Sequence, residues 1–280
     1  MNMRMVKHFV TVFVLLALAP AFADNGHSLP MAKPESVGMS SARLERIGER
    51  MQWYIDQKLV PGTVTLVARK GKVVHFEARG QRWVEQNQPM KEDAIFRIAS
   101  MTKPITSVAL MMLFEEGKFQ LNDPIAKWLP EFTNMQVAVP TEGDPAGVPY
   151  KLVPADKPIT IEHVLTHTAG FDDRYLGIGT ALTQKTDPLR HYLSQHMPAR
   201  VLPPGKFFAY SNHAFALAGL VVEEVSGECF DNYIAKHIFA PLKMTHSSFG
   251  VPEPVPAEIA VPYAHDAFPS RFSKIELDRQ

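Results

Sequence analysis

Cysteine is nearly absent from this chain of 280 residues, which has only one. A single cysteine excludes an internal disulfide framework and a zinc site built from paired cysteines. Neither charge is in excess, because 29 basic side chains balance 29 acidic ones. A chain with no net charge lacks the excess of basic residues that attracts nucleic acid, so nucleic acid is not an expected partner. No repeat with a period of roughly 20–50 residues is present, which argues against a solenoid.

The one long apolar run is at the N-terminus. Residues 1–23 begin with the basic Arg4 and Lys7, continue with an apolar run over 9–19 and end in Ala21-Phe-Ala23, which has small residues at the two positions that a signal peptidase needs. This order predicts a secretory signal peptide that is cleaved after its last residue. The run is too short to span about 30 Å of bilayer hydrocarbon, so we expect no stable membrane anchor after cleavage. The alternative, a buried N-terminal helix, explains neither the charges nor the small residues. The sequence therefore predicts an exported protein, periplasmic or secreted.

The rest of the chain, residues 24–280, is long enough for one domain with its own core. We divide it into a helix and hairpin over 36–80, a mainly helical region over 81–250 and a proline-rich tail over 251–280. The sequence gives no indication of the oligomeric state.

The first part of this domain combines a helical and a strand pattern. Apolar residues at helical spacing predict a helix that starts at Ser40 or Ser41 and is ended by Pro61-Gly62. Two β-branched apolar runs, 63–68 and 73–78, are separated by a short glycine-containing turn and predict a hairpin. Neither run alternates cleanly between apolar and polar residues, so we expect both faces of the hairpin to be buried.

The following region is dominated by helical patterns. They cover 100–117, 160–165, 213–225 and 228–239, with an irregular proline-rich stretch containing short helical pieces over 118–160. No strand is expected after residue 250. An isolated two-stranded hairpin is marginal in water, so a fold of this shape would need more strands.

The first candidate for chemistry is Ser100-Met-Thr-Lys103 at the predicted helix start. Positions i and i+3 share one helix face, so the Lys103 amine can reach the Ser100 hydroxyl. Serine is a poor nucleophile unless a base is adjacent, and free N–H groups at a helix N-terminus can stabilise an oxyanion. Roughly one such spacing is expected by chance in a chain of this length, so alone it also fits an ordinary helix start.

The second candidate is Tyr210-Ser-Asn212, on a loop between Pro203-Pro-Gly205 and a predicted buried helix. A phenol beside a lysine can lose its proton more easily and act as a general base. The Asn212 amide can donate a hydrogen bond to a substrate carbonyl.

Two histidines offer a third pattern. His163 and His167 stand four residues apart on a short predicted helix, a spacing that can bind a metal. The HExxH pattern is absent and no third ligand has a compelling position, so we favour capping and packing roles. We predict neither a metal site nor another cofactor.

Together, these segments resemble the serine β-lactamase superfamily, and most closely its class C and esterase-like branch with the DD-peptidase relatives. The resemblance covers about residues 36–265 and is carried, in order, by Ser100–Lys103, Leu121–Pro124, Ile161–Gly170, Pro204-Gly205 and Tyr210–Asn212, followed by Met244–Phe249. It implies an α/β fold of the β-lactamase/transpeptidase type, in which an antiparallel sheet flanked by helices joins a mainly helical region.

The resemblance also implies a role for each matching residue. Ser100 would be the acylated nucleophile, and its backbone N–H one half of the oxyanion hole. Lys103 would help to deprotonate it, and Tyr210 would relay protons to the leaving group and then activate water. Asn212 would orient the substrate carbonyl or amide. The substrate would be an ester, a β-lactam or a D-amino-acid cell-wall peptide, and Tyr-Ser-Asn points away from class A enzymes.

One element of the family pattern is not found. The family has a Lys-Thr-Gly or His-x-Gly motif on a returning strand, whereas no glycine follows Gly250 here. The expected sheet would then keep two strands and lack the C-terminal strands and the closing helix. Two alternatives to a serine hydrolase therefore stay open: a truncated non-catalytic remnant that acts at most as a binding module, and a metal hydrolase that uses His163 and His167.

Overall fold

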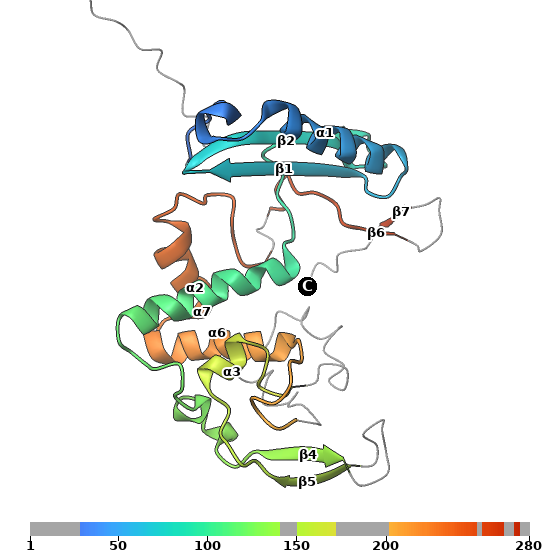
Figure 1. Ribbon diagram of the computed structural model, residues 1–280. Coiled ribbons are helices and arrows are strands. Elements are labelled where there is room, and N and C mark those ends of the chain that lie inside the picture. The colour runs from blue at the N-terminus through green and yellow to red at the C-terminus, as the bar shows by residue number, and fades with distance from the viewer. Residues whose placement is uncertain (1–28, 141–149, 172–201, 251–253, 266–271, 275–280) are drawn as a thin grey trace, which may run out of the picture.

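The computed structural model describes residues 29–140, 150–171, 202–250, 254–265 and 272–274, so the predicted signal peptide lies outside the described residues. A small sheet with one helix lies at one end of the molecule (Figure 1). A helical region occupies the middle, and a separate hairpin lies at the other end. In the part of the chain that is described, no helix is both long and apolar enough to cross a membrane.

The N-terminal helix begins where the sequence predicted. A 3-10 turn, η1 (Pro34–Val37), leads into α1 (Ser41–Asp56), whose N-cap is Ser40. The helix ends earlier than predicted, because the backbone turns into the left-handed region at Lys58 (φ 55°) before Pro61-Gly62 is reached.

The predicted hairpin is confirmed and has a third strand. β1 (Gly62–Arg69) pairs antiparallel with β2 (Lys72–Trp83). Both residues of the connecting turn have positive φ, as a two-residue hairpin turn with matching twist requires. The short strand β3 (Gln88–Pro89) pairs with the far end of β2, so the sheet has the order β1-β2-β3 and the two-stranded expectation is wrong.

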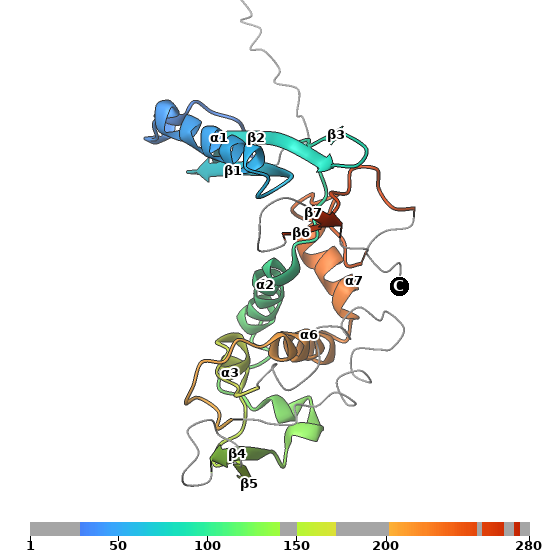
Figure 2. The ribbon, with the colours of Figure 1, turned by 90° about the vertical axis from the view of Figure 1, so that its right-hand side faces the viewer.

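The expectation that both faces of the hairpin are buried is also wrong. No residue of β1 is buried, and Leu66 is 53% exposed. The helix α1 covers one face of the sheet (Figure 2), and Val37, Leu44 and Val74 form a small core there. The β-branched runs reflect strand propensity, whereas burial depends on what lies against each face.

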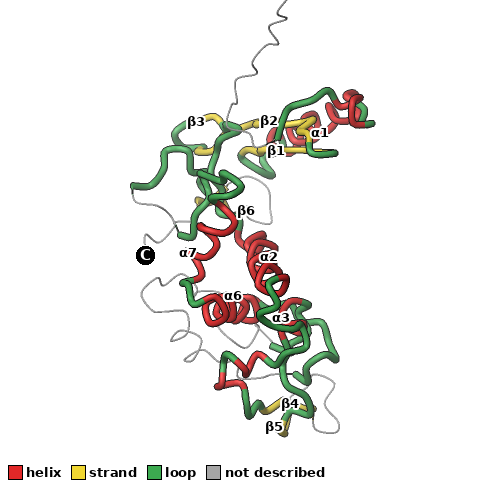
Figure 3. The backbone as a smooth tube through the Cα atoms, turned by 90° about the vertical axis from the view of Figure 1, so that its left-hand side faces the viewer, coloured by secondary structure: helices red, strands yellow, loops and turns green. Residues whose placement is uncertain are grey.

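The helical region contains the main core. It comprises α2 (Thr102–Glu115) after the 3-10 turn η2 (Ala99–Met101), α3 (Ile161–Leu165), α6 (Asn212–Ser226) and α7 (Phe230–Ile234), which continues as the π-helical turn η6 (Ala235–Phe239). All four predicted helices are therefore present, and α2, α3 and α6 lie close together (Figure 3). Leu110 and Leu113 of α2 meet Leu217 and Leu220 of α6 in one cluster of buried side chains.

The stretch 118–160 has more structure than predicted. Two 3-10 turns, η3 (Ile125–Lys127) and η4 (Pro130–Phe132), are followed by β4 (Gln136–Pro140) and β5 (Tyr150–Pro154), which pair antiparallel. Each of these two strands ends on a proline, so the proline-rich stretch resembled a loop in the sequence.

Strands also occur after residue 250, where none was expected. β6 (Tyr263–His265) and β7 (Phe272–Lys274) form an antiparallel pair that is separate from the main sheet. The segment before β6 packs beside the main sheet, because the Val261 amide donates to the carbonyl of Arg82 in β2 at 3.0 Å. The same segment forms a parallel bridge between Ile259 and Ile95.

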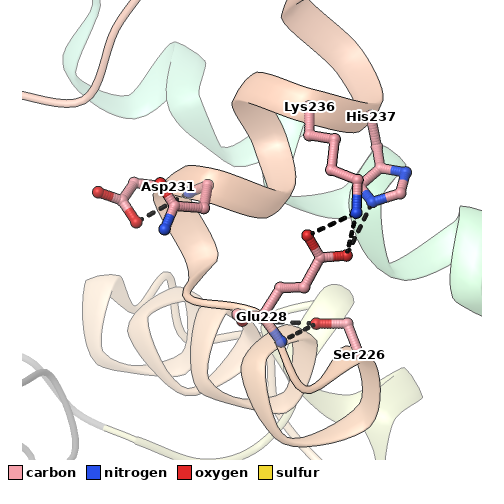
Figure 4. Close-up of polar contacts among 6 residues, drawn as sticks. Ser226, Glu228, Asp231, Lys236 and His237 are labelled. Atoms are coloured by element: carbon pink, nitrogen blue, oxygen red, sulfur yellow. Dashed lines mark hydrogen bonds and ion pairs between the residues drawn. The ribbon is translucent and has the colours of Figure 1, made fainter.

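The corner between α6 and α7 is held by a polar cluster (Figure 4). Gly227 ends α6 in the left-handed region, and the Glu228 carboxylate then accepts hydrogen bonds from Lys236 at 3.0 Å and 3.1 Å. His237 Nε2 lies 3.0 Å from the same carboxylate. The hydrogen bonds from His237 and Lys236 hold the pKa of Glu228 below its usual range, so the ionised carboxylate stabilises this corner.

Candidate active site

The turn before α2 presents Ser100. Ala99 has a φ of 44°, which is a strained left-handed conformation for a residue with a Cβ and costs of the order of 1–2 kcal/mol. The chain then passes through η2 into α2, and the Lys103 Nζ donates to the Ser100 Oγ at 3.2 Å. The spacing of three residues at the helix start therefore places the amine beside the hydroxyl, as predicted.

A ladder of backbone hydrogen bonds joins the loop before α6 to the segment that follows α3. Each of the three bonds is 2.8 Å long, and they run from Leu202, Gly205 and Ala209 to the carbonyls of Gly170, Thr168 and His167, respectively. At Gly170 the two segments leave no room for a side chain, because an added Cβ would lie 2.0 Å from the Leu202 oxygen. Glycine is therefore needed at Gly170, and its φ of 85° needs it as well.

At the end of this ladder the four predicted site residues meet. The Tyr210 hydroxyl donates to the Ser100 Oγ at 2.6 Å. The Lys103 Nζ donates to the Asn212 Oδ1 at 2.7 Å and lies 4.6 Å from the centroid of the Tyr210 ring. Tyr210 is 47% exposed, so solvent reaches this residue of the site.

The two histidines have separate structural partners. His163 Nδ1 accepts from the Thr160 amide at 3.2 Å while the Thr160 hydroxyl accepts from the His163 amide, which is a reciprocal cap of α3. This confirms the predicted capping role, and burial lowers the pKa of His163. His167 Nδ1 accepts from the Ser211 amide at 3.0 Å, and its ring stacks on Tyr210.

No described part of the chain gathers three or more His, Cys, Asp or Glu side chains in a way that could hold a metal ion. Because both Nδ1 atoms accept backbone hydrogen bonds, His163 and His167 do not form a ligand pair in this structure. The geometry thus gives the metal-hydrolase alternative no support.

Comparison with known families agrees with this geometry. The sequence pattern of the family described as beta-lactamase matches residues 45–280. The chain belongs to the beta-lactamase family. Its fold is accordingly the α/β fold of the β-lactamase/transpeptidase type, as the sequence resemblance implied.

Individual relatives of this beta-lactamase-family chain are hydrolases and penicillin-binding protein homologues. Esterase EstB of Burkholderia gladioli is 32% identical over 242 residues, which are 82% of this chain and 56% of EstB. The structure of EstCE1, a hydrolase with promiscuous acyltransferase activity, is 29% identical with a TM-score of 0.68, over 84% of this chain and 60% of EstCE1. A penicillin-binding protein homologue from Pyrococcus abyssi is 26% identical with a TM-score of 0.63, over 84% of this chain and 50% of that homologue.

The length of the match differs between the partners. The chain spans about half the length of the curated relatives it matches, for example 53% of Protein Rv1367c from Mycobacterium tuberculosis, which is 33% identical over 226 residues. The activity of those whole proteins therefore enters only as a proposal for this chain.

Proposed function

We propose that this chain is a serine hydrolase that forms an acyl-enzyme through Ser100 on an ester, a β-lactam or a D-amino-acid peptide. The observation that carries the proposal is the position of the Ser100 Oγ, 2.6 Å from the Tyr210 oxygen and 3.2 Å from the Lys103 nitrogen. Both distances are within the reach that proton transfer requires. We place esters first among the substrates, because a relative that is 32% identical is named an esterase.

Acylation begins when Tyr210 releases its proton to solvent, which reaches this half-exposed residue. In the resting site the phenol donates to Ser100, so Ser100 can donate in return only after the phenol has become a phenolate. The Lys103 ammonium, 4.6 Å from the ring centroid, favours that charged form. The Ser100 oxygen then bonds to the substrate carbonyl carbon as its proton passes to the Tyr210 oxygen. The bond between the carbonyl carbon and the alkoxy oxygen of the ester breaks. The departing alkoxide takes the proton from Tyr210 and leaves as the alcohol.

Deacylation repeats the same proton path with water. A water molecule loses its proton to the Tyr210 oxygen and bonds to the acyl carbon. The bond to the Ser100 oxygen breaks, and Ser100 recovers a proton from Tyr210. The Lys103 hydrogen bond to the Asn212 Oδ1 keeps the ammonium between the two elements throughout.

A labelling experiment tests this proposal. The full chain is incubated with a p-nitrophenyl ester and with a fluorophosphonate probe, and intact mass and peptide mapping locate the adduct. The control is Ser107→Ala, because Ser107 lies on the same helix and donates only to the Lys103 backbone carbonyl at 3.0 Å. We expect the parent chain and this control to be labelled on Ser100 and Ser100→Ala to be unlabelled. An unlabelled parent chain would favour the non-catalytic alternative, and persistent labelling of Ser100→Ala would place the nucleophile elsewhere.

We further propose that the protein is exported, periplasmic or secreted. The support is the order of basic, apolar and small residues over 1–23. Expression of the full chain in a bacterial host, followed by fractionation and N-terminal sequencing, tests this proposal. A product that starts at Asp24 outside the cytoplasm is expected, and a cytoplasmic product that keeps residues 1–23 would contradict it.

A further inference from the structure

We infer that His167 is a positioning residue for Tyr210, which sets the place of the phenol oxygen beside Ser100. The inference rests on the proposed role of Tyr210 in proton transfer, and it gives His167 a role that its motif alone does not indicate. Its contacts with Tyr210 and with the backbone on either side of that residue are those of a group that acts through the tyrosine.

The His167 ring lies among the aromatic side chains of the site. It stacks on Tyr210 with ring centroids 4.5 Å apart and an interplanar angle of 27°. The centroid of the His167 ring also lies 5.7 Å from that of Phe208 and 5.0 Å from that of Phe215. Phe215 in turn lies 5.7 Å from the Lys103 Nζ, so the stack reaches the amine that contacts Ser100. Tyr210 is about half exposed, and this ring contact restricts a side chain that solvent alone would leave free to change rotamer.

The hydrogen bond of His167 acts on the backbone of the same loop. Its Nδ1 accepts from the amide of Ser211, the residue between Tyr210 and Asn212. Ser211 is fully buried, and its hydroxyl accepts from the Ala214 amide as the N-cap of α6. One histidine ring therefore fixes both the Tyr210 ring and the peptide that joins the two site residues to α6.

The acceptor role also defines the protonation of the ring. A nitrogen that accepts the Ser211 amide carries no proton, so the ring in this arrangement is the neutral imidazole without a proton on Nδ1. An imidazolium would place two N–H groups against each other at this contact. The bond to Ser211 therefore requires the neutral ring.

The backbone at His167 is built for this contact. Its φ of 58° is in the left-handed region, where histidine and asparagine are found more often than most other residues with a Cβ. Its carbonyl accepts from the Ala209 amide at 2.8 Å, next to Tyr210. The ring and the backbone of one residue thus bind three successive residues, Ala209, Tyr210 and Ser211.

Two substitutions separate the two contacts. His167→Asn tolerates the left-handed backbone and keeps an acceptor oxygen in the place of Nδ1, but it removes the stacked ring. His167→Phe keeps an aromatic ring and removes the acceptor. The matched control is His163→Asn, because His163 also accepts a backbone amide through Nδ1 and has no ring contact with Tyr210 among the interactions described.

The first readout does not depend on activity. The full chain is labelled with 13C in the tyrosine rings, and the Tyr210 signal is assigned by its loss in Tyr210→Phe. We expect His167→Asn to shift this signal and His163→Asn to leave it in place. An unchanged Tyr210 signal in His167→Asn would overturn the inference even if Ser100 could not be acylated.

The second readout is the rate of ester hydrolysis through Ser100. We expect both His167 variants to lower kcat by about ten- to a hundredfold with KM changed less than about threefold, because a misplaced catalytic group costs rate rather than binding. In a Tyr210→Phe background the same His167→Asn change should have almost no effect. An equal loss in both backgrounds would show that His167 does not act through the tyrosine. Failure of the proposed function would differ, because the parent chain itself would then give no Ser100 adduct.

Discussion

The close approach of two chain segments at Gly170 gives the sharpest stability prediction. In Gly170→Ala, the new Cβ would lie 2.0 Å from the Leu202 carbonyl oxygen, and the residue would have to hold a φ of 85°. Gly117→Ala is the matched reference, because Gly117 also has a positive φ, 72°, but nothing lies within 4 Å of its added Cβ. The difference between the two variants therefore measures the steric contact without the backbone strain.

The expected magnitudes follow from these two terms. A left-handed alanine costs about 1–2 kcal/mol, and the loss of glycine entropy in the unfolded chain returns about 0.4–1 kcal/mol. We therefore expect Gly117→Ala to lower the free energy of unfolding by about 1 kcal/mol. In Gly170→Ala the Leu202 carbonyl must also move, which strains or breaks the 2.8 Å bond from the Leu202 amide to the Gly170 carbonyl. A lost hydrogen bond and local overpacking add about 2 kcal/mol, for a total of about 3 kcal/mol.

Urea unfolding followed by circular dichroism measures both variants. In thermal unfolding, the same loss of about 3 kcal/mol in the free energy of unfolding would lower the Tm by roughly 6–12 °C in a domain of this size. Because the Gly170 ladder carries the chain to Tyr210, Gly170→Ala should also slow acylation of Ser100, whereas Gly117→Ala should not. The reasoning is refuted if Gly170→Ala costs no more stability than Gly117→Ala.

Two further predictions concern the charged contacts. Lys103→Met removes the ammonium beside Tyr210 and Ser100, so we expect stopped-flow acylation to slow by about a hundredfold or more while the circular dichroism spectrum is kept. A smaller loss would show that the Lys103 charge is not needed to form the Tyr210 phenolate. Because folding lowers the pKa of Glu228, the stabilisation by its carboxylate is complete above about pH 4.5, the pKa of the unfolded chain. This stabilisation is lost as the pH falls through the lower pKa of the folded protein. In urea titrations, Glu228→Gln should therefore be less stable than the parent at pH 7, and this difference should nearly vanish at roughly pH 2. A pH-independent difference would contradict the role of the carboxylate.

The two long helices α2 and α6 could be predicted because their sequences carry an apolar pattern and an end signal. The apolar residues of α2 recur at helical spacing, α6 is apolar nearly all round as a buried helix is, and Gly117 and Gly227 end the two patterns in the left-handed region. The hairpin β4–β5 had no such signal, because short runs between prolines are typical of loops as well. Its pairing is a contact between strands, which local propensity does not contain.

The membership of the site was predictable, but its assembly was not. The order of the motifs identified Ser100, Lys103, Tyr210 and Asn212 through the family resemblance. The distances among them depend on the backbone ladder that ends near Tyr210, and no periodicity encodes those hydrogen bonds.

The histidine pair shows the same limit of sequence reasoning. The spacing of His163 and His167 is equally that of two metal ligands and of two separate hydrogen-bond acceptors. The donors that decide between these interpretations are the amides of Thr160 and Ser211, and only the second comes from a distant part of the chain. The tertiary structure, rather than the spacing, therefore assigns the roles.

The most direct test of the account is the rate at which Ser100 gains an acyl group in the parent chain and in Tyr210→Phe. Time-resolved intact-mass measurements with an activated ester give both rates, and this substitution removes only the hydroxyl that lies 2.6 Å from the Ser100 oxygen. The account predicts an adduct on Ser100 that forms about a hundredfold or more slowly in Tyr210→Phe, with the fold unchanged. Equal rates in the two proteins, or an adduct on another residue, would contradict it.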